Sequence, residues 1–279
     1  MLSASRRTRS NDKRGLLDFF NDILGLSEQQ FMGFLLAFLR ISALMSTAPI
    51  FGSQSVPARV KAFLTLFLTI AILPALRTEQ DLSELTLPLL LPMAVKEILV
   101  GLFLGFSAKL IFEAFQFGGR IISNQMGLGI AELIDPESGS QVSAIGNLFS
   151  LVAIVLFLNL NGHHLIISAL YKSFEIAPLT NHQWLKSAAK VKMLTMFNDI
   201  FKIGVKLAAP AMVTILLVEI SMAIMARIVP QMNIFFIGLP VKLGVGMFVI
   251  IISLPIFYTF LEFVLTGWKR DLNEILNYL

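Results

Sequence analysis

The side chains best placed to do chemistry in this chain are charged residues that interrupt long apolar runs. They are Lys96, Glu97, Lys109, Glu113, Lys202, Lys206, Glu219, Lys242 and Glu262. A charge at the centre of a bilayer costs about 2.5–3.5 kcal/mol on insertion scales, so we expect most of these side chains to face other protein or a water-filled path. For Lys202 and Glu262, snorkelling of the charge toward the membrane surface is an equal alternative.

The spacing of these charges predicts which of them pair. Lys109 and Glu113 are four residues apart and can meet on one face of a helix. Lys96 and Glu97 are neighbours that point about 100° apart on a helix, so we do not expect them to satisfy each other.

No signature of enzyme chemistry is present. The chain has no HExxH, GxSxG or P-loop motif, and it has no cysteine for a thiolate metal site or a nucleophile. His163 and His164 have no third metal ligand at helical spacing, so we interpret them as residues at a helix terminus. We therefore predict a protein that is not an enzyme, with no catalytic residue, metal or cofactor. The basic residues are scattered among apolar runs, which argues against a nucleic acid partner.

The elements that must position these charges are membrane-type helices. The 279 residues are 56% hydrophobic and 14% charged, and the mean hydropathy is +0.79. A helix of about 20 apolar residues crosses a bilayer core. Six apolar segments of this kind are predicted near residues 31–51, 60–76, 87–117, 145–171, 203–228 and 234–268. Strand-like alternation is lacking, so the predicted fold class is all-α and polytopic, with broken and kinked helical hairpins.

The first residues form a separate predicted region. Residues 1–26 combine a cluster of Arg and Lys with the stretch LLDFFNDILGL, which indicates a basic extension followed by a short amphipathic helix at the membrane surface. A disordered extension is an equal alternative before Leu16. Residues 27–279 form the second predicted domain. Basic residues on one side of the six-segment arrangement predict that both termini are cytoplasmic, although Arg59 and Lys61 lie on the opposite side.

Glycines and prolines predict close packing and irregular backbone. Gly101 and Gly105 lie four residues apart, and Gly244 lies close to Gly246, so each pair can let another helix approach. Prolines interrupt nearly every apolar segment, and the backbone groups they free must be buried in protein or face water.

Four blocks of sequence resemble a known family. They are residues 39–61, 119–141, 156–170 and 227–244, which include LRISALMSTAPIFGSQSVPARVK, GRIISNQMGLGIAELIDPESGSQ, LFLNLNGHHLIISAL and RIVPQMNIFFIGLPVKLG. In this order they resemble FliR, the export-gate family of the bacterial flagellum, and its counterpart in virulence type III secretion. The likeness extends from about residue 27 to the end of the chain.

The resemblance implies a non-enzymatic core subunit of the flagellar type III protein export gate. Members of this family assemble with FliP and FliQ, in a machine that also contains FlhB and FlhA, and unfolded flagellar proteins pass through the channel. It further implies a place among the lipids of the bacterial inner membrane, in the flagellar basal body. Two alternatives stay open: the equivalent virulence subunit, and a polytopic secondary transporter, for which charges at mid-membrane and broken helices are equally natural.

The first implied site is a turn between the last two apolar segments. Pro230 removes a backbone donor and disfavours helix at Val229, so the stretch predicts a helix-turn-helix tip. The resemblance assigns the narrow entrance of the channel to Pro230, Gln231, Met232 and Asn233. An ordinary hairpin turn without contact to substrate is an equal alternative.

The second implied site is a cluster of aromatic residues before two glycines. Phe112, Phe115 and Phe117 precede Gly118 and Gly119, where we expect the helix to weaken. Aromatic residues at helical spacing more often belong to a core. The resemblance nevertheless implies that this segment is the plug that closes the channel.

Overall fold

The structure is a computed structural model, and it describes residues 28–53, 55–72, 87–129, 143–179, 187–231 and 233–276. Within these ranges the chain forms seven α-helices and no strand, so the predicted all-α class is confirmed. The helices are α2 (Glu28–Thr47), α3 (Ala58–Ile72), α4 (Leu87–Gln125), α6 (Ala144–Asn159), α7 (Gly162–Ile176), α8 (Ser187–Ile228) and α9 (Ile234–Leu276). The predicted N-terminal extension, residues 1–26, lies outside the described residues.

The chain divides into two compact units, and the boundaries that fall within the described residues lie inside α4 and α7. The first unit contains α2, α3, the part of α4 up to Gly105, and the end of α7 from Leu170. The second unit contains the rest of α4 and α7 together with α6, α8 and α9.

Close packing in the first unit depends on the predicted glycine pair. A Cβ atom added to Gly101 would collide with the backbone oxygen of Arg40, and one added to Gly105 would collide with Thr47. Both contacts are with α2, so the two glycines let α2 and α4 approach at van der Waals distance. The prediction for this pair is confirmed.

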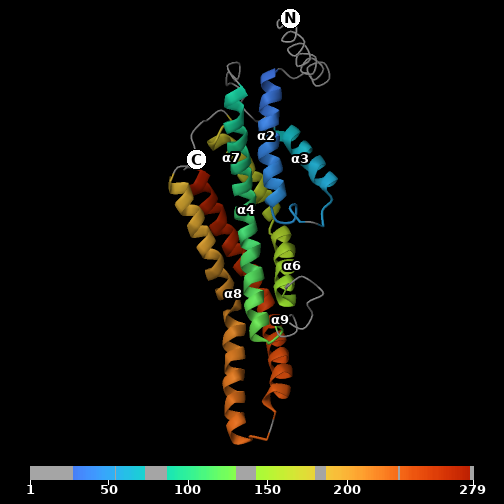
Figure 1. Ribbon diagram of the computed structural model, residues 1–279, viewed down its shortest axis with the longest axis vertical. Helices are drawn as coiled ribbons and strands as arrows, with labels where there is room; N and C mark the ends of the chain where they lie inside the picture. The colour runs from blue at the N-terminus through green and yellow to red at the C-terminus, as the bar shows by residue number, and fades with distance from the viewer. Residues whose placement is uncertain are drawn as a thin grey trace, which may run out of the picture. The chain divides into compact units, whose positions relative to one another are not determined.

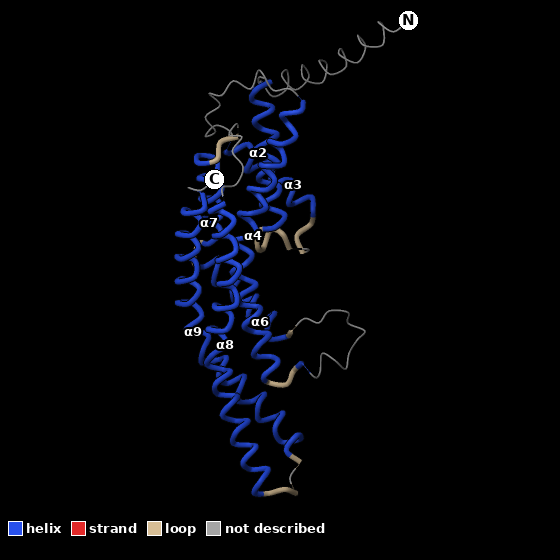
Figure 2. The backbone as a smooth tube through the Cα atoms, turned by 60° about the vertical axis from the view of Figure 1, so that its left-hand side comes forward, coloured by secondary structure: helices blue, strands red, loops and turns tan. Residues whose placement is uncertain are grey.

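In the second unit, α8 and α9 run side by side as a long antiparallel hairpin (Figures 1 and 2). Pro210 lies inside α8, and Pro240 and Pro255 lie inside α9, yet each helix continues through its prolines. Gly246 faces Met126, whereas nothing lies within 4 Å of a Cβ added to Gly244. Only one glycine of this second predicted pair therefore marks a close contact.

The predicted segment at residues 145–171 is two helices rather than one. The chain bends by 70° between α6 and α7. The bend occurs at Leu160 and Asn161, where Asn161 has a left-handed φ of 55°. Asparagine tolerates this conformation because its short polar side chain can bond to the local backbone, so the NLNG sequence contains the reason for the bend.

Within the described residues, the number of helices long enough to cross a membrane is smaller than the six predicted. Among the described residues, three helices have the necessary length and apolar character, within α4, α8 and α9, and the bent α6–α7 pair would be a fourth. The apolar part of α2, Phe31–Thr47, is shorter, and α3 has only 15 residues. Each of the six predicted apolar segments is thus helical where the structure describes it, but within the described residues at most four spans have the length and composition to cross a membrane.

Candidate functional site

The three phenylalanines of the predicted plug lie on α4 and contact three different helices. Phe112 packs edge-on against Phe157 of α6, with 5.2 Å between ring centroids. Phe115 contacts Phe257 and Phe260 of α9, each at 6.2 Å. These two α4 rings are 6% and 0% exposed, so both belong to the core of the second unit.

Phe117 completes the aromatic cluster on another side of α4. Its half-buried ring lies 5.3 Å from that of Phe201 on α8. Phe149 of α6 contacts Phe257 with 4.7 Å between ring centroids, so rings from α6 and α9 meet as well. The aromatic cluster, defined here as Phe112, Phe115, Phe117, Phe149, Phe157, Phe201, Phe257 and Phe260, therefore joins four helices.

The prediction that the helix weakens at Gly118 and Gly119 is wrong. α4 continues to Gln125 without interruption. A Cβ atom on Gly118 would lie 2.8 Å from the backbone oxygen of Gly204 in α8, and one on Gly119 would lie 2.7 Å from Cα of Gly146 in α6. The two glycines therefore mark helix crossings, where the missing side chains let backbones touch and the surrounding packing keeps the helix intact.

The turn predicted at Pro230 is confirmed as the tip of the α8–α9 hairpin. α8 ends at Ile228 and α9 begins at Ile234, and Pro230, Gln231 and Asn233 are exposed between them. The backbone oxygen of Asn233 accepts a hydrogen bond of 3.2 Å from the amide of Phe236, which starts the next helix. Met232, the fourth residue assigned to the channel entrance, lies outside the described residues.

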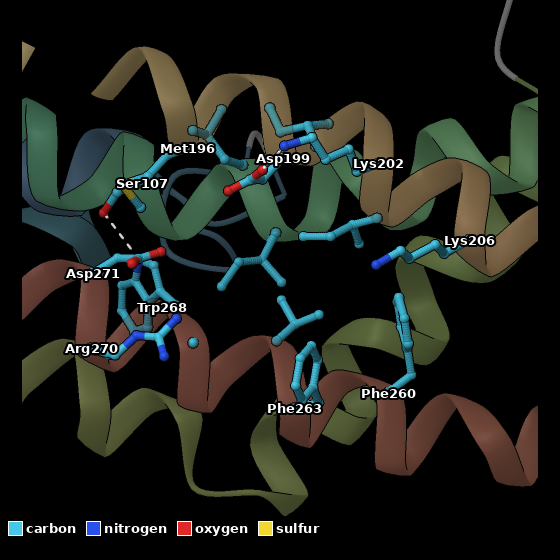
Figure 3. A pocket seen from close by; sticks show the side chains of 16 residues that line it. Ser107, Met196, Asp199, Lys202, Lys206, Phe260, Phe263, Trp268, Arg270 and Asp271 are labelled. Carbon is cyan, nitrogen blue, oxygen red and sulfur yellow. Dashed lines mark hydrogen bonds and ion pairs between the residues drawn. The ribbon is translucent and has the colours of Figure 1, made fainter. Parts of the chain in front are cut away.

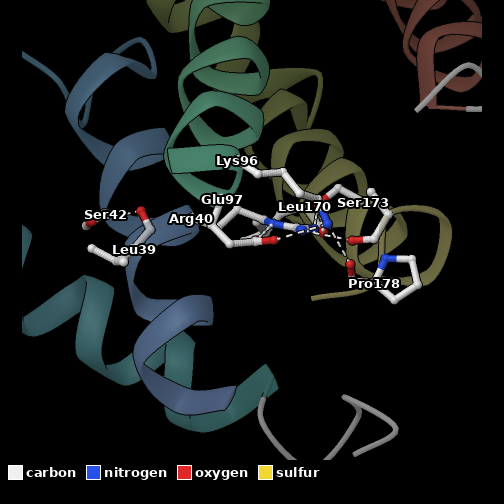
Figure 4. A network of polar contacts seen from close by, with 9 residues as sticks. Leu39, Arg40, Ser42, Lys96, Glu97, Leu170, Ser173 and Pro178 are labelled. Atoms are coloured by element: carbon white, nitrogen blue, oxygen red, sulfur yellow. Dashed lines mark hydrogen bonds and ion pairs between the residues drawn. The ribbon is translucent and has the colours of Figure 1, made fainter. Parts of the chain in front are cut away.

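A buried polar network in the first unit was not predicted as such, and its centre is Arg40 (Figure 4). The guanidinium donates from Nε to Glu97 Oε2 at 2.5 Å, from one terminal nitrogen to Ser173 Oγ at 3.1 Å, and from the other to the backbone oxygen of Ala177 at 2.8 Å. Its carbon Cζ also lies 4.2 Å from the centroid of the Phe174 ring, in cation–π geometry. Arg40 and Glu97 are both 0% exposed.

The sequence signal for this network is a single arginine in the middle of an apolar helix. Arg40 interrupts the run from Phe31 to Thr47, and an arginine at such a position requires a buried acceptor. Its partners lie on α4 and at the end of α7, 57 to 137 residues away. Sequence spacing could not identify them.

Lys96 belongs to the same network. Its ammonium donates to the backbone oxygen of Pro178 at 2.7 Å and lies 3.5 Å from Glu97 Oε1. The prediction that these neighbours do not pair is therefore wrong, because the flexible four-carbon stem of lysine bends around the helix to reach the carboxylate. Lys96 and Arg40 together place two cations at the C-terminus of α7, where unpaired carbonyls and the helix dipole favour positive charge.

Three further ion pairs involve charges singled out in the sequence. Lys109 and Glu113 approach to 3.6 Å, as predicted from their spacing. Lys202 pairs with Asp199 at 2.9 Å on the exposed face of α8. Lys242 of α9 reaches Glu219 of α8 at 2.5 Å, so the hairpin carries an ion pair among apolar residues.

A cavity of about 240 Å³ lies between α4, α8 and α9 (Figure 3). Its walls are mostly apolar, and Trp268 Nε1 donates to Ser107 Oγ at 3.3 Å on one side. Lys206 and Arg270 also line the cavity and lie toward its opposite ends. The nearby predicted plug residues do not line it.

Metal binding finds no support among the described residues, where no group of three His, Asp or Glu side chains could hold an ion. His163 and His164 follow the first residue of α7, with their rings 4.2 Å apart. The prediction that they mark a helix terminus is confirmed.

Residues 31–267 match the family described as bacterial export proteins, family 1. The chain is 34% identical to the flagellar biosynthetic protein FliR of Bacillus subtilis over 250 residues, which cover 88% of this chain and 95% of the relative. It is 34% identical to FliR of Escherichia coli, covering 86% and 91% of the two chains. With FliR of Aquifex aeolicus the identity is 30%, over 82% and 88%.

Proposed function

The chain belongs to the FliR family of flagellar biosynthetic proteins, within family 1 of the bacterial export proteins, and we propose that it is a core subunit of the flagellar type III export gate. In this role it forms, with FliP and FliQ, the channel through which unfolded flagellar proteins leave the cell. FlhB and FlhA are further partners in this proposal. The chain itself performs no enzymatic step, and the energy for export comes from elsewhere in the machine.

The observation that carries this proposal is the large apolar surface left uncovered on the α8–α9 hairpin. In α8, only 22% of an 18-residue apolar stretch is buried within the chain, and in α9 the corresponding share is 33%. Exposed side chains on the two helices include Leu217, Ile220, Phe248 and Ile251, each between 50% and 63% exposed. Exposure of so large an apolar patch to water is unfavourable, so lipid or other subunits must cover it.

The ion pair on this hairpin favours protein over lipid as part of that cover. Glu219 and Lys242 are 37% and 24% exposed within the chain, and contact with lipid tails would be costly for both. Neighbouring subunits can surround them with polar groups or a water-filled path. This supports a hetero-oligomeric channel in the inner membrane, at the flagellar basal body, rather than a single-chain transporter.

The site residues are assigned to two places along this channel. We assign the entrance to the exposed tip at Pro230, Gln231, Met232 and Asn233. The closure is assigned to the α4 segment with Phe112, Phe115, Phe117, Gly118 and Gly119. Because Phe112 and Phe115 are buried against α6 and α9, their part in closure is to hold α4 in place with its neighbours. Phe117 and the two glycines set how closely α8 and α6 approach α4.

The direct test is purification of the tagged full-length chain from its native membrane in mild detergent. FliP and FliQ should be recovered with it in fixed proportion, and co-expression of both should raise the yield of folded chain. A monodisperse chain recovered alone, at equal yield with and without the two partners, would reject the export-gate role and favour the transporter.

A further inference from the structure

The part of α4 that belongs to the second unit exposes only polar side chains. In α4, 67% of an 18-residue apolar stretch is buried within the chain, a larger share than in α8 or α9. Of residues 106–125, only Lys109, Arg120 and Asn124 are exposed, so the exposed side chains of this segment are all polar. The uncovered face of this helix therefore differs in character from that of the α8–α9 hairpin, which is apolar.

The exposed residues belong to a polar stripe, defined here as Lys109, Glu113, Gln116, Arg120 and Asn124. Its members follow one another at steps of four, three, four and four residues, so at 3.6 residues per turn all five lie within an arc of about 80°. From first to last the stripe extends about 22 Å at 1.5 Å per residue, which is most of the roughly 30 Å of a hydrocarbon core.

Lipid is an unfavourable environment for this stripe. Lysine and arginine can extend their charged ends toward the membrane surface, but the shorter carboxamide side chains of Gln116 and Asn124 cannot. Arg120 forms no ion pair within the described part of the chain. Near the bilayer centre, a charge in lipid costs about 2.5–3.5 kcal/mol on insertion scales.

Contacts of α4 with α8 and α9 show what surrounds the stripe at the same level. Gly118 crosses α8 at Gly204, and Phe115 contacts Phe257 of α9. Close to these contacts along α8 and α9, four apolar side chains are between 45% and 73% exposed: Phe201, Val205, Ile256 and Phe263. An apolar cover is therefore needed at the level of the stripe, so this part of the molecule does not simply project into bulk water.

Water in an enclosed path satisfies the stripe better than a protein surface does. A protein surface would have to supply an acceptor for the guanidinium of Arg120, and both donors and acceptors for the carboxamides of Gln116 and Asn124. Water provides all of these without a fixed geometry. A helix that is buried on its apolar sides and polar on its remaining face has the pattern expected at the wall of an aqueous path.

We infer that the polar stripe of α4 faces a water-filled path enclosed by the assembled gate. The inference rests on the proposed function and assigns which face of the α4 segment is turned toward that path, whereas Phe112 and Phe115 are buried in the core. An unfolded polypeptide in transit then passes a hydrated wall with two cations and one carboxylate, to which its apolar side chains do not adhere.

Thiol accessibility tests the orientation of α4, because the chain contains no cysteine. Gln116→Cys, Arg120→Cys and Asn124→Cys are made singly in the tagged full chain and purified in the complex with FliP and FliQ. The controls are Ala108→Cys and Ala114→Cys, two fully buried positions off the stripe. The stripe positions should react with a small charged methanethiosulfonate at least about 10-fold faster, since the reaction requires a hydrated thiolate.

Two further measurements separate an enclosed path from the outer surface of the complex. Val205→Cys, on an exposed apolar position of α8 at the same level, should react as slowly as the buried controls. A bulky polyethylene-glycol maleimide should fail to modify the stripe. Fast reaction of Val205→Cys, or modification of the stripe by the bulky reagent, would show that the stripe lies on an open surface and would overturn the inference.

Slow reaction at all three stripe positions would also overturn the inference. If FliP and FliQ are present in that preparation, the export-gate role stands and only the orientation of α4 fails. A chain recovered alone at equal yield would instead reject the proposed function, and this result is read from the purification before any labelling.

Substitution of the unpaired arginine gives an independent readout. With water beside it, Arg120→Leu and its polar control Arg120→Gln should both leave the yield of assembled complex within about twofold of wild type, as at other solvated positions. If lipid or an apolar subunit surface covered this face, Arg120→Leu would remove a buried charge and raise the yield by about 10-fold or more over Arg120→Gln. That rise would contradict a water-filled path.

Discussion

Arg40 and Glu97 form an ion pair of 2.5 Å from which solvent is fully excluded, since neither side chain is exposed. The guanidinium uses its other nitrogens on Ser173 and Ala177, so one residue of α2 binds both α4 and the end of α7. A buried pair is stable only when the remaining donors and acceptors are also satisfied, and this arrangement meets that condition for the arginine.

Replacing only one member of this ion pair should lower stability more than replacing both. We expect Arg40→Met to destabilise the first unit by about 3–5 kcal/mol, because Glu97 keeps its buried charge without its shortest partner. The double variant Arg40→Met, Glu97→Met should recover much of that loss. Protease resistance of the purified complex across a denaturant series measures the effect.

An exposed pair is the control for this experiment. Lys202→Met removes the ion pair with Asp199. Because the side chains of Lys202 and Asp199 are 69% and 44% exposed, stability should change by about 1 kcal/mol or less. If the Arg40 single variant and the double variant were equally unstable, the charge pairing would not be the source of the effect.

Alanine substitution should destabilise the protein at a glycine in a helix crossing and stabilise it at the glycine that faces open space. Gly119→Ala places a methyl group 2.7 Å from Gly146 Cα and should cost about 1–3 kcal/mol, because α4 and α6 must separate. The methyl group of Gly244→Ala meets nothing within 4 Å inside α9 and should stabilise the helix by about 0.5–1 kcal/mol. Thermal unfolding of the two variants of the isolated chain tests this contrast, and equal shifts would contradict it.

A charge at the same crossing should have a larger effect. Gly119→Asp adds a carboxylate where the backbones of α4 and α6 touch, at a cost of several kcal/mol if it remains unpaired. We expect the yield of assembled complex to fall well below that of Gly119→Ala. Normal assembly of Gly119→Asp would show that the crossing can open.

The aromatic cluster can be tested for closure as distinct from packing. The triple variant Phe112→Ala, Phe115→Ala, Phe117→Ala removes the rings through which α4 contacts α6, α8 and α9. If the α4 segment closes the channel, the complexes that assemble should conduct small ions at rest, because an aromatic layer excludes water from a narrow pore. Conductance is normalised to the amount of assembled complex.

Packing alone predicts a different result for the triple variant. Complex yield would fall by an amount set by the lost apolar contacts, about 3–5 kcal/mol for each fully buried ring, and no assembled complex would leak. That outcome would move the closure elsewhere, with the tip at Pro230 to Asn233 as the next position to test.

The ion pair on the hairpin should matter more in the complex than in the chain. Glu219→Gln should cost about 1 kcal/mol or less in the isolated chain, where Glu219 and Lys242 are 37% and 24% exposed. Neighbouring subunits that exclude water should raise this cost to about 3–5 kcal/mol in the assembled complex. The exchanged pair Glu219→Lys, Lys242→Glu should restore much of it. A cost that does not change on assembly would indicate that the pair stays in contact with water.

Much of the fold could be predicted because helix formation is local. Apolar composition located the helical segments, although it did not separate α6 from α7 or place the start of α8. Pro230 with its polar neighbours located the tip of the hairpin, since proline acts on the backbone of its immediate neighbours. The spacing of Lys109 and Glu113 predicted their pairing for the same reason.

The misses concern interactions between distant parts of the chain. Gly118 and Gly119 were expected to weaken α4, because glycine alone disfavours a helix, but contacts with Gly204 and Gly146 offset that tendency. Arg40 received no assignment, because a buried arginine is intelligible only once its acceptors are known, and these lie 57 to 137 residues away.

The sequence by itself therefore determined the helical class, the approximate place of each helix and membership in an export family, all of which depend on composition and on the order of short motifs. Only the tertiary structure decided which charges are buried, which glycines lie at helix crossings and which phenylalanines belong to a core. Those properties depend on which surfaces meet when the helices pack, and side chains with the same local sequence can be buried or exposed according to their neighbours in space. Phe63 and Phe67 of α3 are 72% and 67% exposed, whereas Phe112 and Phe115 of α4 are buried, so both outcomes occur within one chain.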